Sequence, residues 1–155
     1  MLAISACSKR IAYVFFMGDD LRDWRVSETA ARGPNEAATH TQIWVNELKP
    51  EVVVTEKIAA AKKKGEKAKN LIAAVARTAE HNYVLDVSVD RPDIHANKYD
   101  EAAALAGRYP ELKAWLPRKR RFFENEPRSI VLFEALALAE QVRQGPPAAL
   151  AAAMG

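Results

Sequence analysis

The chain has 155 residues, of which 49% are hydrophobic and 28% charged, and its net charge is +3, which suits one ordinary globular domain with an adequate core. No apolar run is long enough to span a membrane, and the single cysteine, Cys7, excludes an internal disulfide and a multi-cysteine zinc site. We therefore expect a cytoplasmic protein that has no membrane partner.

The first part of the chain predicts three strands joined by short turns. Residues 2–6 form a short apolar run, and residues 10–18 are rich in the aromatic and β-branched types that suit a pleated surface. Turn-forming residues follow at 18–20, and residues 21–28 then alternate between the two sides of a strand. Together these segments predict an antiparallel meander.

The middle of the chain alternates between helix and strand. Residues 31–50 carry apolar side chains at helical spacing, Pro34 suits the first turn of this helix, and Pro50 marks its end. Three consecutive valines within 51–56 predict a strand buried on both faces. Residues 63–82 predict a second helix, with lysines crowded at its start, and residues 83–89 predict another strand.

The last third of the chain is expected to be mainly helical. Residues 98–109 predict a short helix, and residues 110–128, with three prolines and many charges, predict a long and partly irregular connection. Residues 129–143 predict a strongly apolar helix. We therefore expect one domain over residues 1–143 and a low-complexity tail over 144–155.

This order of elements predicts an α/β fold. Three antiparallel strands followed by parallel strands would form a mixed five-stranded sheet, with helices on both faces. Sites in such sheets gather at the carboxyl ends of the parallel strands. Glu56 ends the valine strand and Asp90 follows the last strand, so both are candidate site residues, whereas Asp86 lies inside its strand.

The basic residues are clustered. They gather in "KKKGEKAK" at 62–69 and in "RKRR" at 118–121, where two phenylalanines follow. Either cluster alone is more typical of a solvated surface. Two such clusters in one small domain, one of them near Glu56, favour a phosphate-backbone partner.

Five segments resemble the bacterial RuvC family of Holliday-junction resolvases, a branch of the ribonuclease H-like proteins. They are "LAISACSKRIAYVFF" at 2–16, "LKPEVVVTEKI" at 48–58, "GEKAKNLIAAVA" at 65–76, "HANKYDEAAALA" at 95–106 and "FEALALAEQ" at 133–141. The resemblance lies in the order of these five weak motifs. It implies a ribonuclease H-like fold, branched DNA as the partner in DNA recombination, and a two-fold dimer.

The resemblance also implies a carboxylate site that holds two Mg²⁺ or Mn²⁺ ions for phosphodiester hydrolysis. It implies one acid on the first strand, one at the end of the fourth strand and a pair on the last helix. This chain has Glu56 at the fourth-strand position and Glu134 at one helix position, and these two are the expected metal ligands. Ser5 and Val131 stand where the other two acids are expected.

The candidate catalytic set is therefore Glu56, Glu134, Ser5 and Asp90. A serine hydroxyl can contact a metal ion but brings no negative charge, so metal binding is expected to be weak or absent if no other acid substitutes. Asp90 is the better-placed substitute because it lies at a strand end. The predicted nucleic-acid-binding residues are Lys9, Arg10, Lys57, Lys62, Lys63, Lys64, Lys67, Arg91, Lys98, Arg118, Lys119, Arg120 and Arg121.

Two functions from different classes remain open at this point. The first is a metal-dependent endonuclease that acts on branched DNA with an altered acid set. The second is a DNA-binding or scaffold protein that keeps the fold and the basic surface but has lost hydrolysis. Glu56 and Glu134 favour the first, and Ser5 favours the second. A third and weaker alternative is that the basic segments bind a partner protein.

Overall fold

A computed structural model describes residues 1–61, 64–91, 97–118 and 126–144. Its strands are Leu2–Ala6 (β1), Ile11–Met17 (β2), Asp20–Ser27 (β3), Val52–Glu56 (β4) and Leu85–Val89 (β5). Its α-helices are Pro34–Leu48 (α1), Glu66–His81 (α2), Lys98–Arg108 (α3) and Ile130–Gln144 (α4). Short 3₁₀ helices cover Thr29–Arg32 (η1), Ile58–Ala60 (η2) and Pro110–Trp115 (η3).

The five strands form one mixed sheet in the order β3-β2-β1-β4-β5. The strands β1, β2 and β3 pair antiparallel as a meander, whereas β4 pairs parallel with β1 and β5 pairs parallel with β4. The carboxyl ends of β1, β4 and β5 therefore meet at one edge of the sheet, which we call the carboxyl edge. Any polar side chain at the end of these three strands is brought to the same place.

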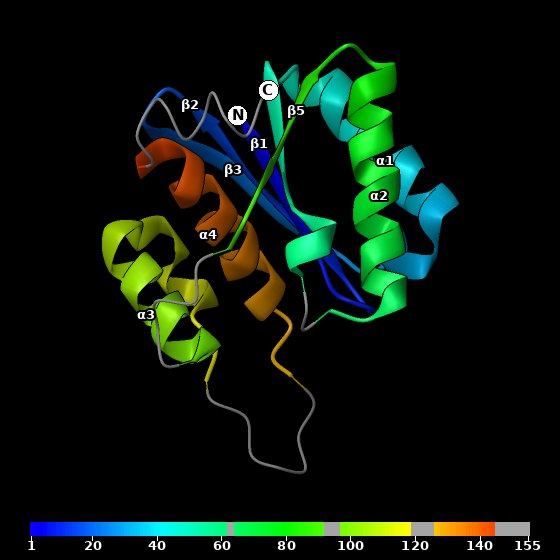
Figure 1. Ribbon diagram of the computed structural model, residues 1–155. Helices are drawn as coiled ribbons and strands as arrows, with labels where there is room; N and C mark the ends of the chain where they lie inside the picture. Colours follow the sequence, from blue (N-terminus) through cyan, green and yellow to red (C-terminus); the bar gives the residue numbers. More distant parts are fainter. Residues whose placement is uncertain (62–63, 92–96, 119–125, 145–155) are drawn as a thin grey trace.

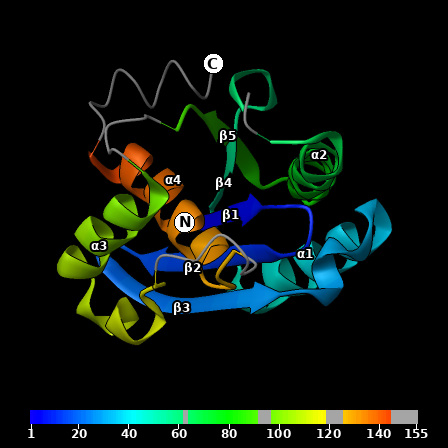
Figure 2. The ribbon, with the colours of Figure 1, turned by 90° about the horizontal axis from the view of Figure 1, so that it is seen from below.

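Helices cover both faces of the sheet, as Figures 1 and 2 show. The helices α1 and α2 lie on one face, and α3 and α4 lie on the other. Alternate residues of β1 therefore pack into the two cores on opposite faces of the sheet. Leu2 and Ile4 pack toward α1 and α2, whereas Ala3 packs toward α4. This period-two alternation decides which side chains of each strand can reach α4.

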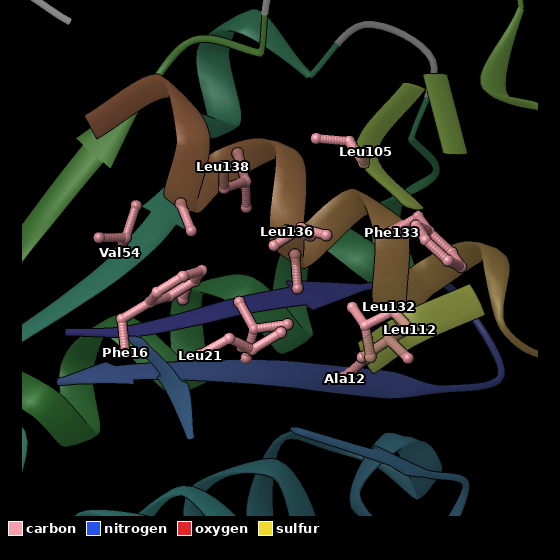
Figure 3. Close-up of a cluster of buried hydrophobic side chains, with 14 of the residues drawn as sticks. Ala12, Phe16, Leu21, Val54, Leu105, Leu112, Leu132, Phe133, Leu136 and Leu138 are labelled. Carbon is pink, nitrogen blue, oxygen red and sulfur yellow. The ribbon is translucent and has the colours of Figure 1, made fainter. Parts of the chain in front are cut away.

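The α4 side of the sheet holds a continuous apolar core (Figure 3). Phe16 and Leu21 come from the sheet, Leu105 from α3, and Leu132 and Leu136 from α4. Each fully buried side chain of this kind contributes about 1.5–3 kcal/mol. Because α4 is buried along most of its length, it is firmly positioned across the sheet.

The elements expected from the sequence are confirmed, with small shifts at their ends. The segment 31–50 begins with the last residues of η1, and Gly33 then separates η1 from α1, whose first residue is Pro34. The connection at 110–128 begins with the 3₁₀ turn of η3, and its residues 119–125 lie outside the described part of the chain.

The predicted tail boundary at residue 144 stays a prediction, because residues 145–155 are outside the described ranges. None of the helices in the described residues combines the length and the apolar character that crossing a bilayer requires.

Candidate functional site

Polar side chains from distant parts of the sequence meet at the carboxyl edge. Ala3 of β1 and Val54 of β4 pack in the α4-side core, so Ser5 and Glu56, two residues further along each strand, point to the same face. Glu134 lies in the first turns of α4, which crosses that face. Strand period, strand pairing and helix packing thus bring these three side chains together in one largely buried cluster of polar side chains, which we call the pocket.

Glu134 is the centre of the pocket, and its side chain is only 13% exposed. Its Oε2 accepts a hydrogen bond from Ser5 Oγ at 3.1 Å and another from Lys64 Nζ at 2.9 Å. Its Oε1 lies 3.5 Å from Arg91 Nη1. Burial by itself would raise the pKa of this carboxyl, but the charges of Lys64 and Arg91 and the two hydrogen bonds outweigh it and lower the pKa.

Arg91 bridges two glutamates from different helices. It follows β5 and pairs through Nη2 with Oε1 of Glu101 on α3, as well as through Nη1 with Glu134 on α4. Burial opposes the charge of the guanidinium, yet the two carboxylates overcome that effect and raise the pKa of Arg91. The group is therefore a permanent cation inside the pocket.

Glu56 differs from Glu134 in its contacts. It is 7% exposed, and its Oε1 is buried without a hydrogen-bond partner among the described residues. Burial is the largest cause of the raised pKa of this carboxyl, and Lys64 opposes it. The negative charges of Glu134 and Asp90 raise the pKa further, whereas Arg91 lowers it. Glu56 and Glu134 are therefore close enough for their charges to interact.

The residues present do not fit a two-metal site. In the described ranges no group of three or more aspartate, glutamate, histidine or cysteine side chains is arranged to hold a metal ion. The β1 position carries the neutral Ser5, and both oxygens of Glu134 already face protein cations. Hard divalent ions need several oxygen ligands with formal negative charge. In this pocket Glu134 and Glu101 are already paired with protein cations, and burial raises the pKa of Glu56.

The two aspartates near β5 lie apart from the centre of the pocket. Asp90 is exposed just beyond the strand and raises the pKa of Glu56 through its charge. Asp86 points to the α2 side of the sheet, where its Oδ1 accepts a hydrogen bond from Thr55 Oγ1 at 3.1 Å. Asp90 is thus the nearer of the two to the pocket, and its influence there is electrostatic.

Three lysines lie exposed around the carboxyl edge and form what we call the lysine rim: Lys9, Lys57 and Lys67. Lys9 lies in the turn after β1, and Lys57 follows Glu56 directly. Lys67 lies in the first turn of α2, which starts beside the same edge (Figure 1). The rim therefore lies at the edge of the sheet where β1, β4 and β5 end.

Of the other predicted nucleic-acid-binding residues, Lys64 and Arg91 pair with Glu134 inside the pocket, and the rest fall into two groups. Arg10 lies 3.7 Å from Glu28, Lys98 pairs with Glu126, and Arg118 is exposed after η3. The remaining ones lie outside the described residues: Lys62, Lys63, Lys119, Arg120 and Arg121.

Reasoning from the sequence missed the pairing of Lys64 and Arg91 with Glu134, and it missed Glu101 altogether. Lys64 and Glu134 are 70 positions apart, and no local pattern links them. Lys64 stands among three consecutive lysines, so composition alone predicts a solvated charge. Only the packing of α4 against β1 brings Glu134 to this lysine.

Comparisons with known proteins bear on the fold. No protein-family model and no curated protein sequence matches the chain. Among solved structures, Thermus thermophilus RuvC matches with a TM-score of 0.58 at 17% identity, over 93% of this chain and 95% of that one. The same protein in complex with a Holliday junction substrate matches with a TM-score of 0.59 at 16% identity, over 93% and 94% of the two chains.

A third solved structure, the yeast mitochondrial Holliday junction resolvase Ydc2, matches with a TM-score of 0.50 at 12% identity, over 89% of this chain and 75% of that one. At such identities the likeness concerns the fold. The mixed five-stranded sheet with helices on both faces, which the sequence predicted, is confirmed as the ribonuclease H-like α/β fold that RuvC has.

Proposed function

We propose that the protein binds branched DNA through the lysine rim and does not hydrolyse it. The observation that carries this proposal is the contrast between the rim and the pocket. Lys9, Lys57 and Lys67 are exposed where a DNA backbone could reach them, whereas the carboxylate that the resemblance assigns to catalysis, Glu134, is neutralised inside the protein. Exposed lysines supply the electrostatic part of backbone binding.

Further support comes from the fold. A neighbour of the same fold was solved in complex with a Holliday junction substrate, so the scaffold can present a surface to four-way DNA. The net charge of +3 is small. Because the three lysines of the rim gather at the carboxyl edge, that edge is the side expected to face DNA. A homodimer that matches the two-fold symmetry of a junction is part of this proposal.

The direct test is fluorescence anisotropy with a labelled four-way junction, a duplex of equal length and a single strand, each at several salt concentrations. We expect the junction to bind most tightly and affinity to fall steeply with salt. The same mixtures, incubated with Mg²⁺ or Mn²⁺ and run on a denaturing gel, should contain only intact strands. Equal affinity for all three DNAs, or none at low salt, would refute branched-DNA binding.

A second candidate is the metal-dependent endonuclease. One observation favours it: the buried Oε1 of Glu56 has no hydrogen-bond partner among the described residues, and a metal ion would satisfy that oxygen by coordination. This candidate requires junction cleavage that depends on Mg²⁺ or Mn²⁺ and is lost in Glu56→Gln. Cleavage that persists unchanged in Glu56→Gln would refute Glu56 as a ligand of a catalytic metal ion.

A further inference from the structure

The pocket contains a basic side chain where a carboxylate site would hold a metal ion. Lys64 Nζ donates to Oε2 of Glu134 at 2.9 Å and to the backbone carbonyl of Ala6 at 2.6 Å. Its side chain is 11% exposed. A lysine buried to this degree is rare unless it is paired, and here its ammonium joins the end of β1 to α4.

A second cation lies on the opposite oxygen of the same carboxylate. Arg91 contacts Oε1 of Glu134 at 3.5 Å and also pairs with Glu101, and its side chain is 22% exposed. Each oxygen of Glu134 thus faces a different protein cation. The three carboxylates Glu56, Glu101 and Glu134 are opposed by two fixed positive charges.

These contacts are incompatible with a divalent ion at Glu134. A Mg²⁺ ion binds its oxygen ligands at about 2.1 Å and demands near-octahedral geometry, but Oε2 is already engaged by Ser5 and Lys64. An ion at this position would also lie beside two protein cations and be repelled by both. It could enter only if Lys64 left the carboxylate.

We infer that Lys64 and Arg91 are built-in counter-ions that replace divalent metal ions in this pocket. The charge that a bound metal would supply comes instead from the η2–α2 connection and from the end of β5. The cluster joins β1, β5, α3 and α4 at the carboxyl edge. The protein therefore keeps this edge assembled in the complete absence of divalent cations.

Thermal unfolding of the full chain tests this inference without DNA. The melting temperature of the wild type is measured in EDTA, Mg²⁺ and Mn²⁺, and isothermal calorimetry with Mn²⁺ is run on the same protein. We expect the three melting temperatures to agree within about 1 °C and calorimetry to detect no site. A Mn²⁺-induced rise in the wild type that disappears in Glu134→Gln would overturn the inference.

Removal of the ammonium provides the complementary experiment. In EDTA, Lys64→Ala should lower the melting temperature by at least about 5 °C, since one partner of a buried pair is removed. Mn²⁺ should then recover part of that decrease, because an ion that binds only the folded state stabilises it by mass action. The matched control is Lys67→Ala, which removes the same charge from the exposed rim three residues away.

The inference fails if Lys64→Ala unfolds at the same temperature as Lys67→Ala, or if Mn²⁺ stabilises Lys64→Ala no more than Lys67→Ala. If Lys64→Ala does not fold, the wild-type calorimetry and the conservative Lys64→Arg, which should restore folding in EDTA, decide the question. DNA binding through the lysine rim would stand in either case, because neither measurement involves DNA.

Discussion

At the residue scale, the two glutamates of the pocket have opposite electrostatic situations. Glu134 has three partners and a lowered pKa, whereas Glu56 is also buried, has an oxygen without a partner among the described residues and has a raised pKa. Lys64 and Arg91 stabilise the charged form of Glu134, whereas burial destabilises the charged form of Glu56. Their substitutions should therefore change stability in opposite directions.

Glu134→Gln should destabilise the protein by about 3 kcal/mol, because it leaves two buried cations, Lys64 and Arg91, without their shared counter-charge. Urea unfolding at neutral pH measures this difference. The matched control is Glu47→Gln on the exposed face of α1, which should change the free energy of unfolding by less than about 0.5 kcal/mol. Equal effects of the two substitutions would show that the ion pairs contribute nothing.

Glu56→Gln should leave the protein as stable as the wild type at neutral pH, or more stable. The folded-state pKa of Glu56 is raised, so between the ordinary glutamate value and this raised value the folded state binds more protons than the unfolded one. The contribution of Glu56 to stability is thus present at low pH and disappears as pH rises through its folded pKa. Urea unfolding from pH 4 to 8 should show that the free energy of unfolding of the wild type falls with rising pH relative to that of Glu56→Gln. The same pH dependence in both proteins would refute the raised pKa of Glu56.

At the scale of elements, α4 is held at both ends by polar contacts that flank its apolar core. Its first turns carry Glu134, and its last turns carry Glu140 and Arg143. Glu140 accepts hydrogen bonds from Tyr109, between α3 and η3, and from Arg108 at 2.9 Å. Arg143 reaches Oδ1 of Asp19 in the β2–β3 turn at 3.0 Å. The helix thus ties the sheet to α3.

Tyr109→Phe should lower the free energy of unfolding by about 1–2 kcal/mol. Burial and the hydrogen bond to Glu140 raise the pKa of Tyr109 to about 12, and the substitution leaves a nearly buried carboxylate with one donor fewer. Tyr83→Phe is the matched control, since that side chain is 97% exposed and should change stability negligibly. If both variants unfold at the same urea concentration, the hydrogen bond of Tyr109 has no energetic value.

The elements that the sequence predicted well are those with strong local patterns. The alternation in β3 and the valine run in β4 correctly predicted these two strands and the order of elements along the chain. The expectation that Glu56 and Glu134 lie near each other came from the resemblance, and their charges do interact in the structure. The start of α1 at Pro34 agrees with the proline that suits a first helical turn, whereas the short 3₁₀ helix η1 before Gly33 was not predicted. Local periodicity carries no information on which distant charges will pair, so the sequence did not reveal the ion pairs of Lys64 with Glu134 and of Arg91 with Glu101.

At the scale of the whole molecule, the charges are divided between an inner and an outer set. The inner cations Lys64 and Arg91 face carboxylates and contribute little field outside the protein. The outer cations of the lysine rim face solvent at the same edge. The surface proposed to bind DNA therefore lies at the same edge of the sheet as the Glu134 cluster, and the proposal assigns DNA binding to the outer set of charges alone.

Lys57→Gln/Lys67→Gln should weaken binding to a four-way junction about tenfold at moderate salt. It should also reduce the slope of log affinity against log salt by up to about 2, because each lysine that neutralises a phosphate adds roughly one to that slope. Anisotropy titrations at several salt concentrations measure both quantities. The matched control is Lys49→Gln/Arg77→Gln, which removes two exposed charges that lie after α1 and late in α2, away from the carboxyl edge. An equal decrease in the control would refute the rim as the binding surface.

The most direct test of whether Lys64 and Arg91 take the place of metal ions is anomalous diffraction from a crystal of the wild-type protein soaked in Mn²⁺. We predict no anomalous peak between Glu56 and Glu134, and electron density for Lys64 Nζ within hydrogen-bonding distance of Oε2 of Glu134. A Mn²⁺ peak ligated by Glu56 and Glu134, with Lys64 displaced from the pocket, would contradict both the internal counter-ions and the absence of hydrolysis.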